Sequence, residues 1–298
     1  MLNFNSEEKQ DNMQKGKRID NRSREFIIDG LGANRKKVEA KRHTALSGPP
    51  GVGKSYGTIE ECRKNNVNYI HIAPGTSDIV LITKIAIGVY KLKKNEELVV
   101  IFDDADDMIF GTYADLNKWK IAMAKPDPSI GFIPSISHQV DMGNTMTKLE
   151  KQGKTELITA LQSFMSDEEI GITIPTDRCR FIILCNLDLE DPKAFKGKLK
   201  SAVPPVLDRL RYDRITMGED EQWGWLAHVL GQSQPFPGYP LKPDQKIELL
   251  NWIKPYWSRM RSTSYRAVEE MAEAMINNPK TYEDLWLRQL KSTTAVAK

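Results

Sequence analysis

The sequence predicts an α/β fold with three layers, in which helices cover both sides of a parallel sheet, followed by a small all-helical domain. Three features predict it. Short apolar runs end in polar or glycine-rich turns, helical patterns lie between these runs, and about the last 80 residues carry helical patterns alone. Apolar runs of this length suit strands that are buried on both faces of a parallel sheet. Their alternation with helices is typical of three-layer domains.

Five apolar runs are the predicted strands of this sheet. They are "HTALSG" (43–48), "NYIHIAPG" (68–75), "LVVIFDD" (98–104), "RFIILCN" (180–186) and "YDRITM" (212–217). Helices are predicted between them over 55–65, 79–92 and 155–165. The α/β core is therefore expected to span 25–217, after a polar, weakly ordered and basic arm over 1–24.

The chain from 218 to 298 is expected to form the helical domain, because its apolar residues recur at helical spacing. The segment from about 110 to 155 fits neither pattern and is expected to be an insert rich in Pro, Gly and Ser. A structureless loop of that length inside a compact domain is usually functional or disordered. We interpret Phe110, Tyr113 and Trp119 as core residues, with the lining of a substrate-gripping pore as the alternative.

Composition and charge narrow the function classes. With 40% hydrophobic and 28% charged residues, the chain resembles an ordinary globular protein. The net charge of +3 does not by itself indicate nucleic-acid binding. Residues 1–47 hold eleven basic and seven acidic residues, which suits a solubilising arm or an arm that meets DNA or an acidic partner. Three cysteines without Cys-x-x-Cys spacing favour a cytoplasmic protein. No apolar segment reaches the ~20 residues that span a membrane.

The stretch "GPPGVGKS" (48–55) has the spacing of a phosphate-binding loop, G-x-x-x-x-G-K-[ST]. Backbone N–H groups curl round a triphosphate in such a loop, and only glycine lets the chain approach so closely. Lys54 is predicted to reach the phosphate oxygens, and Ser55 to bind Mg²⁺ through its hydroxyl. ATP and Mg²⁺ are the predicted cofactors. The predicted nucleotide-binding residues are Gly48, Pro49, Pro50, Gly51, Val52, Gly53, Lys54, Ser55 and Tyr56.

Four carboxylates follow the most apolar strand within five positions. They are Asp103, Asp104, Asp106 and Asp107. Carboxylates this close repel one another unless a cation, a partner or water relieves them. A phosphate-binding loop predicts a second strand that ends in a carboxylate holding Mg²⁺. Asp103 is therefore the predicted metal carboxylate, beside Ser55, and Asp104 the base that orients or deprotonates the attacking water. Asp106 and Asp107 are expected just beyond, on a solvated turn.

These motifs resemble those of the AAA+ ATPase superfamily, over about residues 25 to 275. "GPPGVGKS" resembles the Walker A motif and "VVIFDD" the Walker B motif. "RFIILCN" resembles a sensor 1 strand, which implies that Asn186 helps to position the attacking water. "PPVLDRLRYDRI" resembles the arginine-finger segment, with Arg209 at the matching position, and "STSYRAVEEM" resembles the sensor 2 helix, with Arg266 in that role. The compact layout is similar to that of small AAA+ ATPases encoded by phages.

The resemblance implies a Mg²⁺-dependent enzyme that hydrolyses ATP to ADP and phosphate, forms a ring such as a hexamer, and remodels a protein or complex. Two features depart from the family. Asp104 stands where the family usually has Glu, and its side chain reaches about 1.5 Å less far. A misplacement of a catalytic group by about 1 Å can cost ~10²-fold in rate. About 80 residues separate Asp104 from Asn186, where the family usually needs one helix. Arg211 and Arg214 are the alternatives to Arg209 as the finger.

Other functions and roles stay open. A nucleic-acid-linked switch of the helicase or clamp-loader type is the main alternative, supported by the basic arm and by lysines of the insert. These are Lys118, Lys120, Lys148, Lys151 and Lys154. A P-loop kinase is a third class, against which the helical C-terminal domain and the pair of Asn186 and Arg209 argue. His43 is expected at the surface, with a contact to adenine as the alternative.

Overall fold

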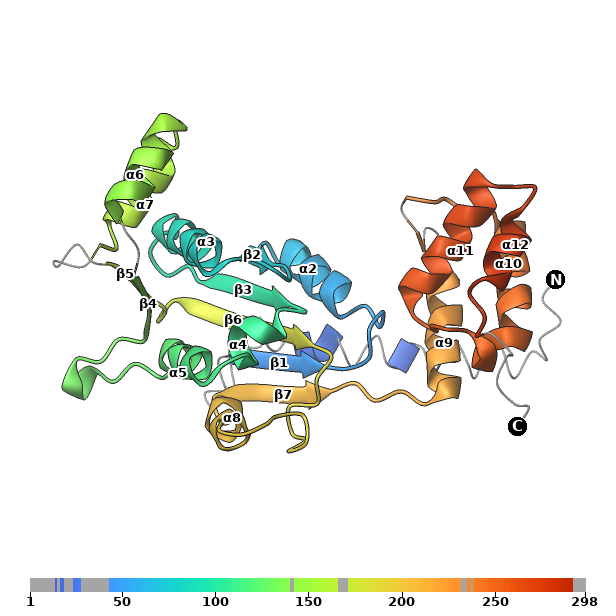
Figure 1. Ribbon diagram of the computed structural model, residues 1–298, viewed down its shortest axis with the longest axis horizontal. Helices are drawn as coiled ribbons and strands as arrows, with labels where there is room; N and C mark the ends of the chain where they lie inside the picture. The colour runs from blue at the N-terminus through green and yellow to red at the C-terminus, as the bar shows by residue number, and fades with distance from the viewer. Residues whose placement is uncertain are drawn as a thin grey trace. The chain divides into compact units, whose positions relative to one another are not determined.

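Figure 1 shows a computed structural model of the chain, which describes residues 14, 17–18, 24–27, 43–139, 142–165, 171–231, 235–236 and 238–291. The basic arm predicted over 1–24 lies almost entirely outside the described residues. Contacts divide the chain into two compact units. Residues 24–48 and 54–214 belong to the first, which we call the α/β unit. Residues 49–53 belong with the chain from Ile215 onward to the second, the helical unit.

Five parallel strands form the sheet of the α/β unit, in the order β2-β3-β6-β1-β7. They are β1 (His43–Ser47), β2 (Asn68–Ile72), β3 (Leu98–Asp103), β6 (Cys179–Cys185) and β7 (Leu210–Arg214). Each overlaps the run predicted for it, so the predicted parallel sheet is confirmed. All of β1 and the first five residues of β3 are buried, as expected for strands covered on both faces.

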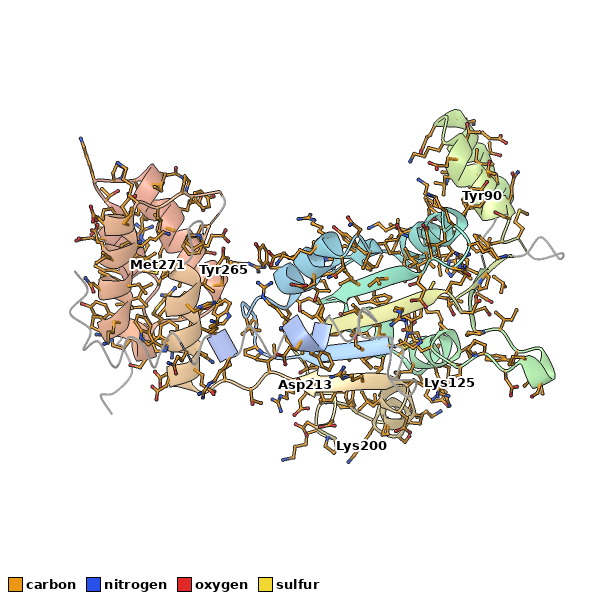
Figure 2. The ribbon with its side chains drawn as sticks, turned by 180° about the vertical axis from the view of Figure 1, so that it is seen from behind. Tyr90, Lys125, Lys200, Asp213, Tyr265 and Met271 are labelled. Carbon is orange, nitrogen blue, oxygen red and sulfur yellow. The ribbon has the colours of Figure 1, made fainter. Side chains whose placement is uncertain are left out.

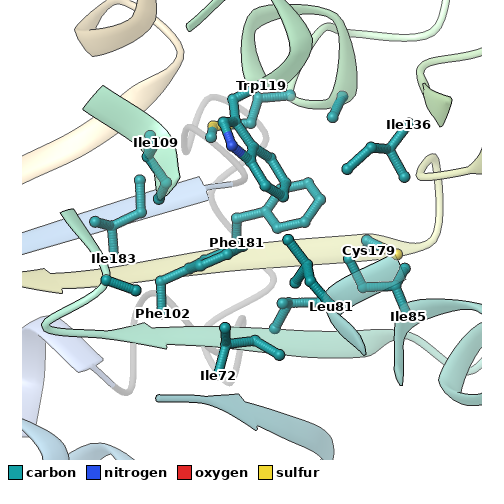
Figure 3. Packing of buried hydrophobic residues seen from close by; sticks show 14 of the residues in the cluster. Ile72, Leu81, Ile85, Phe102, Ile109, Trp119, Ile136, Cys179, Phe181 and Ile183 are labelled. Carbon is teal, nitrogen blue, oxygen red and sulfur yellow. The ribbon is translucent and has the colours of Figure 1, made fainter. Parts of the chain in front are cut away.

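One face of the sheet is covered by helices that pack into a single apolar cluster. These helices are α3 (Asp78–Tyr90), α4 (Asp106–Phe110), α5 (Tyr113–Ala122) and α8 (Leu199–Leu207). Figure 3 shows Trp119 of α5 within this cluster, where it is fully buried. Its ring is edge-on to Phe102 and Phe181, with centroids 4.9 and 5.6 Å away. Its Nε1 donates to the carbonyl of Met108 at 2.8 Å. Helix α5 therefore packs directly on β3 and β6.

Helix α2 (Lys54–Lys64) follows β1 and contacts the described residues of the N-terminal segment. Arg24 donates to Glu61 at 3.0 Å. The guanidinium of Arg211 on β7 lies 4.8 Å from the ring centroid of Phe26. The residues before the sheet thus bind both the helix that starts at the predicted phosphate loop and an edge strand.

The predicted insert has regular structure of its own. It holds α5, the 3-10 turn η1 (Pro128–Ile130), β4 (Ser135–Gln139) and α6 (Met142–Lys151). The helix predicted over 155–165 follows as α7 (Thr155–Gln162), and β5 (Gly171–Pro175) comes after it. β4 and β5 pair as an antiparallel hairpin, and α7 packs against α3 (Figure 1). The expectation of a structureless loop is therefore wrong: short strands that pair with each other, between turns rich in Pro, Gly and Ser, leave little periodicity to read. Phe110 and Trp119 are buried core residues as predicted, whereas Tyr113 is 50% exposed.

The helical unit has a separate core. Its helices are α9 (Glu219–Leu230), α10 (Pro243–Tyr256), α11 (Tyr265–Asn277) and α12 (Tyr282–Leu287), with the 3-10 turn η2 (Trp257–Arg259) after α10. Figure 2 shows Met271 among the packed side chains, and its carbonyl accepts a hydrogen bond from Nε1 of Trp286 at 2.8 Å. The predicted C-terminal helical region is confirmed. Among the described segments, no helix has the length and apolar character needed to cross a membrane.

Candidate functional site

Three strands end at the same edge of the sheet and bring predicted site residues together. In the register of the sheet, Ser47 at the end of β1 lies opposite Cys185 of β6, and Asp103 of β3 lies opposite Leu184. Backbone N–H of Gly48 donates to the carbonyl of Cys185 at 3.2 Å. Because parallel strands share one carboxyl edge, the residues that follow them are neighbours. Side chains far apart in the sequence therefore share one site.

Lys54 is the first residue of α2 and only 6% of it is exposed. Its Nζ donates to the carbonyl of Gly48 at 2.8 Å and to Oδ1 of Asn186 at 2.9 Å. Burial lowers the pKa of Lys54, while nearby carboxylates, above all Asp104, act in the opposite direction. A buried ammonium needs acceptors or negative charge around it. The site therefore surrounds this cation with oxygen atoms at the edge of the sheet.

Asp103 is bound by two side chains. Oγ of Ser55 donates to Oδ1 at 2.5 Å, and Nε2 of His71 lies 3.0 Å from Oδ2. The Asp103 carboxyl group is therefore held at both of its oxygens. Nζ of Lys84 donates to the backbone carbonyl of His71 at 3.2 Å. Within the described residues, no group of three His, Cys, Asp or Glu side chains forms a metal site. A cation beside Asp103 would therefore take further ligands from water or a substrate, as Mg²⁺ does.

Asp104 leaves β3 with an unusual backbone conformation. Its φ of +48° lies in the left-handed region, which Asp tolerates better than most residues. Its N–H donates to the carbonyl of Leu184 at 3.0 Å, so the turn is tied to the neighbouring strand. Its Oδ1 accepts from Nδ2 of Asn186 at 2.9 Å. The turn therefore places the Asp104 carboxylate beside the amide that also binds Lys54.

Asp106 does not lie on a solvated turn, contrary to the sequence prediction. It is the first residue of α4, and its Oδ1 is buried without a hydrogen-bond partner among the described residues. Burial, then the charges of Asp104 and Asp107, raise the pKa of Asp106 to about 6, and the Asn186 backbone and Lys54 act in the opposite direction. Asp107 is exposed, as predicted. The α4 helix starts inside the site, which the count of carboxylates did not reveal.

The loop between β1 and α2 is glycine-rich for a steric reason. Gly51 has a φ of +77° and Gly53 of +81°, a region that favours glycine. A Cβ at Gly51 would lie 2.7 Å from Cβ of Ser264 and 2.8 Å from the backbone N of Tyr265. Gly51 therefore has no room for a side chain. Residues 49–53 and these neighbours all belong to the helical unit.

Three arginines compete for the predicted role of the finger. They are Arg209, Arg211 and Arg214. The guanidinium of Arg211 lies over the ring of Phe26, and Arg214 pairs with Asp188. Arg209 is partly exposed, and its Nη1 donates to the backbone carbonyl of Pro205. Arg209 is thus held by a main-chain contact, while the other two are engaged with side chains of their own chain. Arg266 is exposed on α11, in the helical unit.

One predicted residue, His43, differs from expectation, and one residue of the site was missed. His43 is buried in β1, where its Nδ1 accepts from the backbone N–H of Phe181 at 3.1 Å, so the surface role is wrong. Tyr56, predicted to bind nucleotide, is 65% exposed. His71 was not predicted as part of the site. The sequence did hold a signal for it, since His71 is a polar residue near the carboxyl end of a predicted strand. The register of the sheet places that end of β2 beside the end of β3, where Asp103 lies.

No protein-family model and no curated protein matches the chain. A buried ammonium, an amide, a hydroxyl and two carboxylates meet at the carboxyl edge of a parallel sheet. Such a set can hold an anionic ligand together with a hard cation, and it offers a carboxylate that can take a proton.

Proposed function

We propose that the chain is a Mg²⁺-dependent ATPase of the AAA+ superfamily that assembles into a ring and remodels a protein or complex. The observation that carries this proposal is the hydrogen-bonded set at the sheet edge. Lys54 binds Asn186, Asn186 binds Asp104, and Ser55 binds Asp103. These contacts join the predicted phosphate loop to the ends of two strands, which is the arrangement that the motif resemblance implies.

The residues present fit a magnesium-bound triphosphate. The ammonium of Lys54 is buried among acceptors, where phosphate oxygens would add negative charge to compensate it. Ser55 and Asp103 offer the hydroxyl and carboxylate oxygens that Mg²⁺ prefers. The positive φ of Gly51 and Gly53 is the conformation that lets backbone N–H groups converge on an anion. When bound, Mg²⁺ neutralises charge on the phosphate oxygens.

Asp104 and Asn186 would handle the attacking water. Oδ1 of Asn186 accepts from Lys54, so its Nδ2 must face the other way, toward Asp104. The amide is therefore oriented from both sides. Oδ1 of Asp104 is engaged by that amide, which leaves Oδ2 to accept a proton from water. These contacts support Asp104 as the base and Asn186 as the residue that positions the attacking water.

The proposal that subunits assemble into a ring depends on Arg209. An arginine finger reaches the phosphate of a neighbouring subunit and stabilises charge in the transition state. Arg209 is partly exposed at the end of α8 and is not engaged by a side chain of its own subunit in the described contacts. A nucleic-acid-linked switch is the second candidate function, for which an exposed lysine segment, described below, is the specific observation.

Binding of ATP and release of phosphate by the Lys54→Ala variant test the proposal. We expect this variant to lose both, because the buried cation at the sheet edge is gone. Lys64→Ala is the matched control, since Lys64 ends the same helix and its exposed ammonium pairs with Glu60. It should retain both. Normal ATP affinity in Lys54→Ala would refute the phosphate-loop assignment. A phosphorylated acceptor in place of free phosphate would indicate a kinase.

A further inference from the structure

A second cluster of cations lies outside the site, on the segment that links β6 to α8. We call it the lysine segment. Its members are Lys193, Lys196, Lys198 and Lys200. All four are exposed, and none forms an ion pair with another described residue. Figure 2 shows Lys200 at the outer margin of the α/β unit. Four charges within eight positions, with no carboxylate among them, form a compact source of positive potential.

The lysine segment is held in place by the residues around it. Phe195 lies between its first two lysines and is buried, 8% exposed, with its ring centroid 5.8 Å from that of Phe110. The N–H of Lys193 donates to Oδ1 of Asp191 at 2.9 Å. The last lysine, Lys200, lies in the first turn of α8. An anchored segment loses little conformational freedom when a partner binds.

The charges also oppose the local helix. Helix α8 begins at Leu199, has no acidic residue in its first turn, and has Lys198 at its N-cap without a side-chain cap. The N-terminal end of a helix carries partial positive charge, so lysines there are unfavourable to the helix. A local conflict of this kind is typical of residues kept for a function other than folding.

The chemistry of the lysine segment fits phosphate better than protein. Lysine is depleted in protein–protein interfaces, whose centres are apolar and aromatic. None of the large exposed apolar side chains in the described chain lies between 187 and 207. Lysines without large exposed apolar neighbours are instead the groups that contact the backbone of DNA or RNA, where they position the strand without reading bases. We propose that the lysine segment binds the phosphate backbone of a nucleic acid, independently of base sequence.

Fluorescence anisotropy with labelled DNA of random sequence tests this proposal, in the absence of ATP so that its outcome does not depend on the proposed ATPase. The variant carries Lys→Gln at all four positions of the lysine segment, a change that preserves length and helix propensity. For duplex DNA we expect affinity to fall by ~10²-fold or more at low salt. The slope of log K against log salt should become shallower by about 3 to 4, since each lost phosphate contact removes about 0.9.

The matched control removes four other exposed lysines that form no described ion pair. These are Lys93, Lys94, Lys125 and Lys280, each changed to Gln. The control should keep the parent slope within about one contact. An equal change in both variants would overturn the assignment, as would parent protein that does not bind DNA at low salt. Poly-L-glutamate that competes as well as DNA at equal charge would assign the surface to an acidic protein instead. Circular dichroism checks that both variants fold.

Discussion

Asp104 is one methylene shorter than the glutamate that AAA+ ATPases usually carry at the matching position, and the backbone around it offers a compensation. Its left-handed φ of +48° turns the residue out of β3, and Asn186 binds its carboxylate at 2.9 Å. Reach is then set by the turn as well as by side-chain length. Since a positioned base contributes ~10²–10⁴-fold to rate, we expect Asp104→Asn to bind ATP normally but to lose turnover by about that factor. Phosphate release under saturating ATP measures it.

Asp107→Asn is the control for this change, because it removes the same charge from an exposed neighbour. It should leave turnover as in the parent protein. If Asp104→Asn hydrolysed ATP undiminished, Asp104 would not be the base. If both variants lost turnover equally, the general loss of negative charge at the end of β3 would be the cause.

Asp106 predicts a dependence of stability on pH. The unfolded carboxyl has a pKa near 3.8, and burial raises it to about 6 in the folded protein. The folded state therefore binds this proton more tightly, and the contribution to stability falls as pH rises from about 4 through 6. Above pH 7 the ionised side chain costs on the order of 1–2 kcal/mol, less than the full linkage because it is partly exposed.

We expect Asp106→Asn to raise the melting temperature of the nucleotide-free protein at pH 8 and to change it little at pH 4.5, where the parent carboxyl is protonated. Thermal unfolding followed by circular dichroism at both pH values measures the difference. The groups that face Asp106 are Asp104, Asp107 and Lys54. An equal gain at both pH values would mean that its ionisation is not responsible.

At the scale of single residues, motif spacing predicted which residues would lie together better than it predicted the contacts between them. Lys54, Ser55, Asp103 and Asn186 do lie together, because each follows a strand or starts a helix at one edge of the sheet. The contact of His71 with Asp103 was not predicted, because it depends on the strand order, which local patterns do not contain.

At the scale of elements, apolar runs were sufficient for the sheet and insufficient for the insert. A strand buried on both faces, such as β3, can be recognised in the sequence by a continuous run of apolar residues. The hairpin of β4 and β5 does not, because Ser135–Gln139 and Gly171–Pro175 are only five residues each and lie 32 or more positions apart. The pairing of such strands is a long-range property that no window along the chain can show.

The packing of Trp119, on α5, predicts how β3 is stabilised. Trp119→Ala should reduce the free energy of unfolding by about 3–5 kcal/mol, because it leaves a cavity against Phe102 and Phe181. Trp119→Phe should cost about 1–3 kcal/mol, because it leaves the carbonyl of Met108 without its donor. Urea denaturation measures both. Tyr113→Ala, on the same helix but half exposed, should cost less than about 1 kcal/mol; a loss equal to that of Trp119→Ala would contradict this account.

At the scale of the whole molecule, the loop of residues 49–53 is a covalent link between the two units. It is grouped with the helical unit, although Gly48 and Lys54 on either side of it belong to the α/β unit. On the proposed function, loss of phosphate would change the backbone of this loop, and that change is what would convert hydrolysis into movement.

The proposed ring makes a prediction that single subunits cannot satisfy. Arg209→Ala should bind ATP but not hydrolyse it, because its sites lack the guanidinium of a neighbour. Lys54→Ala should be inactive for the opposite reason, since it keeps the arginine and loses its own site. Mixing the two inactive variants should restore phosphate release, as Arg209 of one subunit completes the intact site of the other. Arg211→Ala, whose side chain lies over Phe26 of its own chain, should stay active alone. Mixtures that remain inactive, while native mass measurement shows mixed assemblies, would exclude Arg209 as the finger.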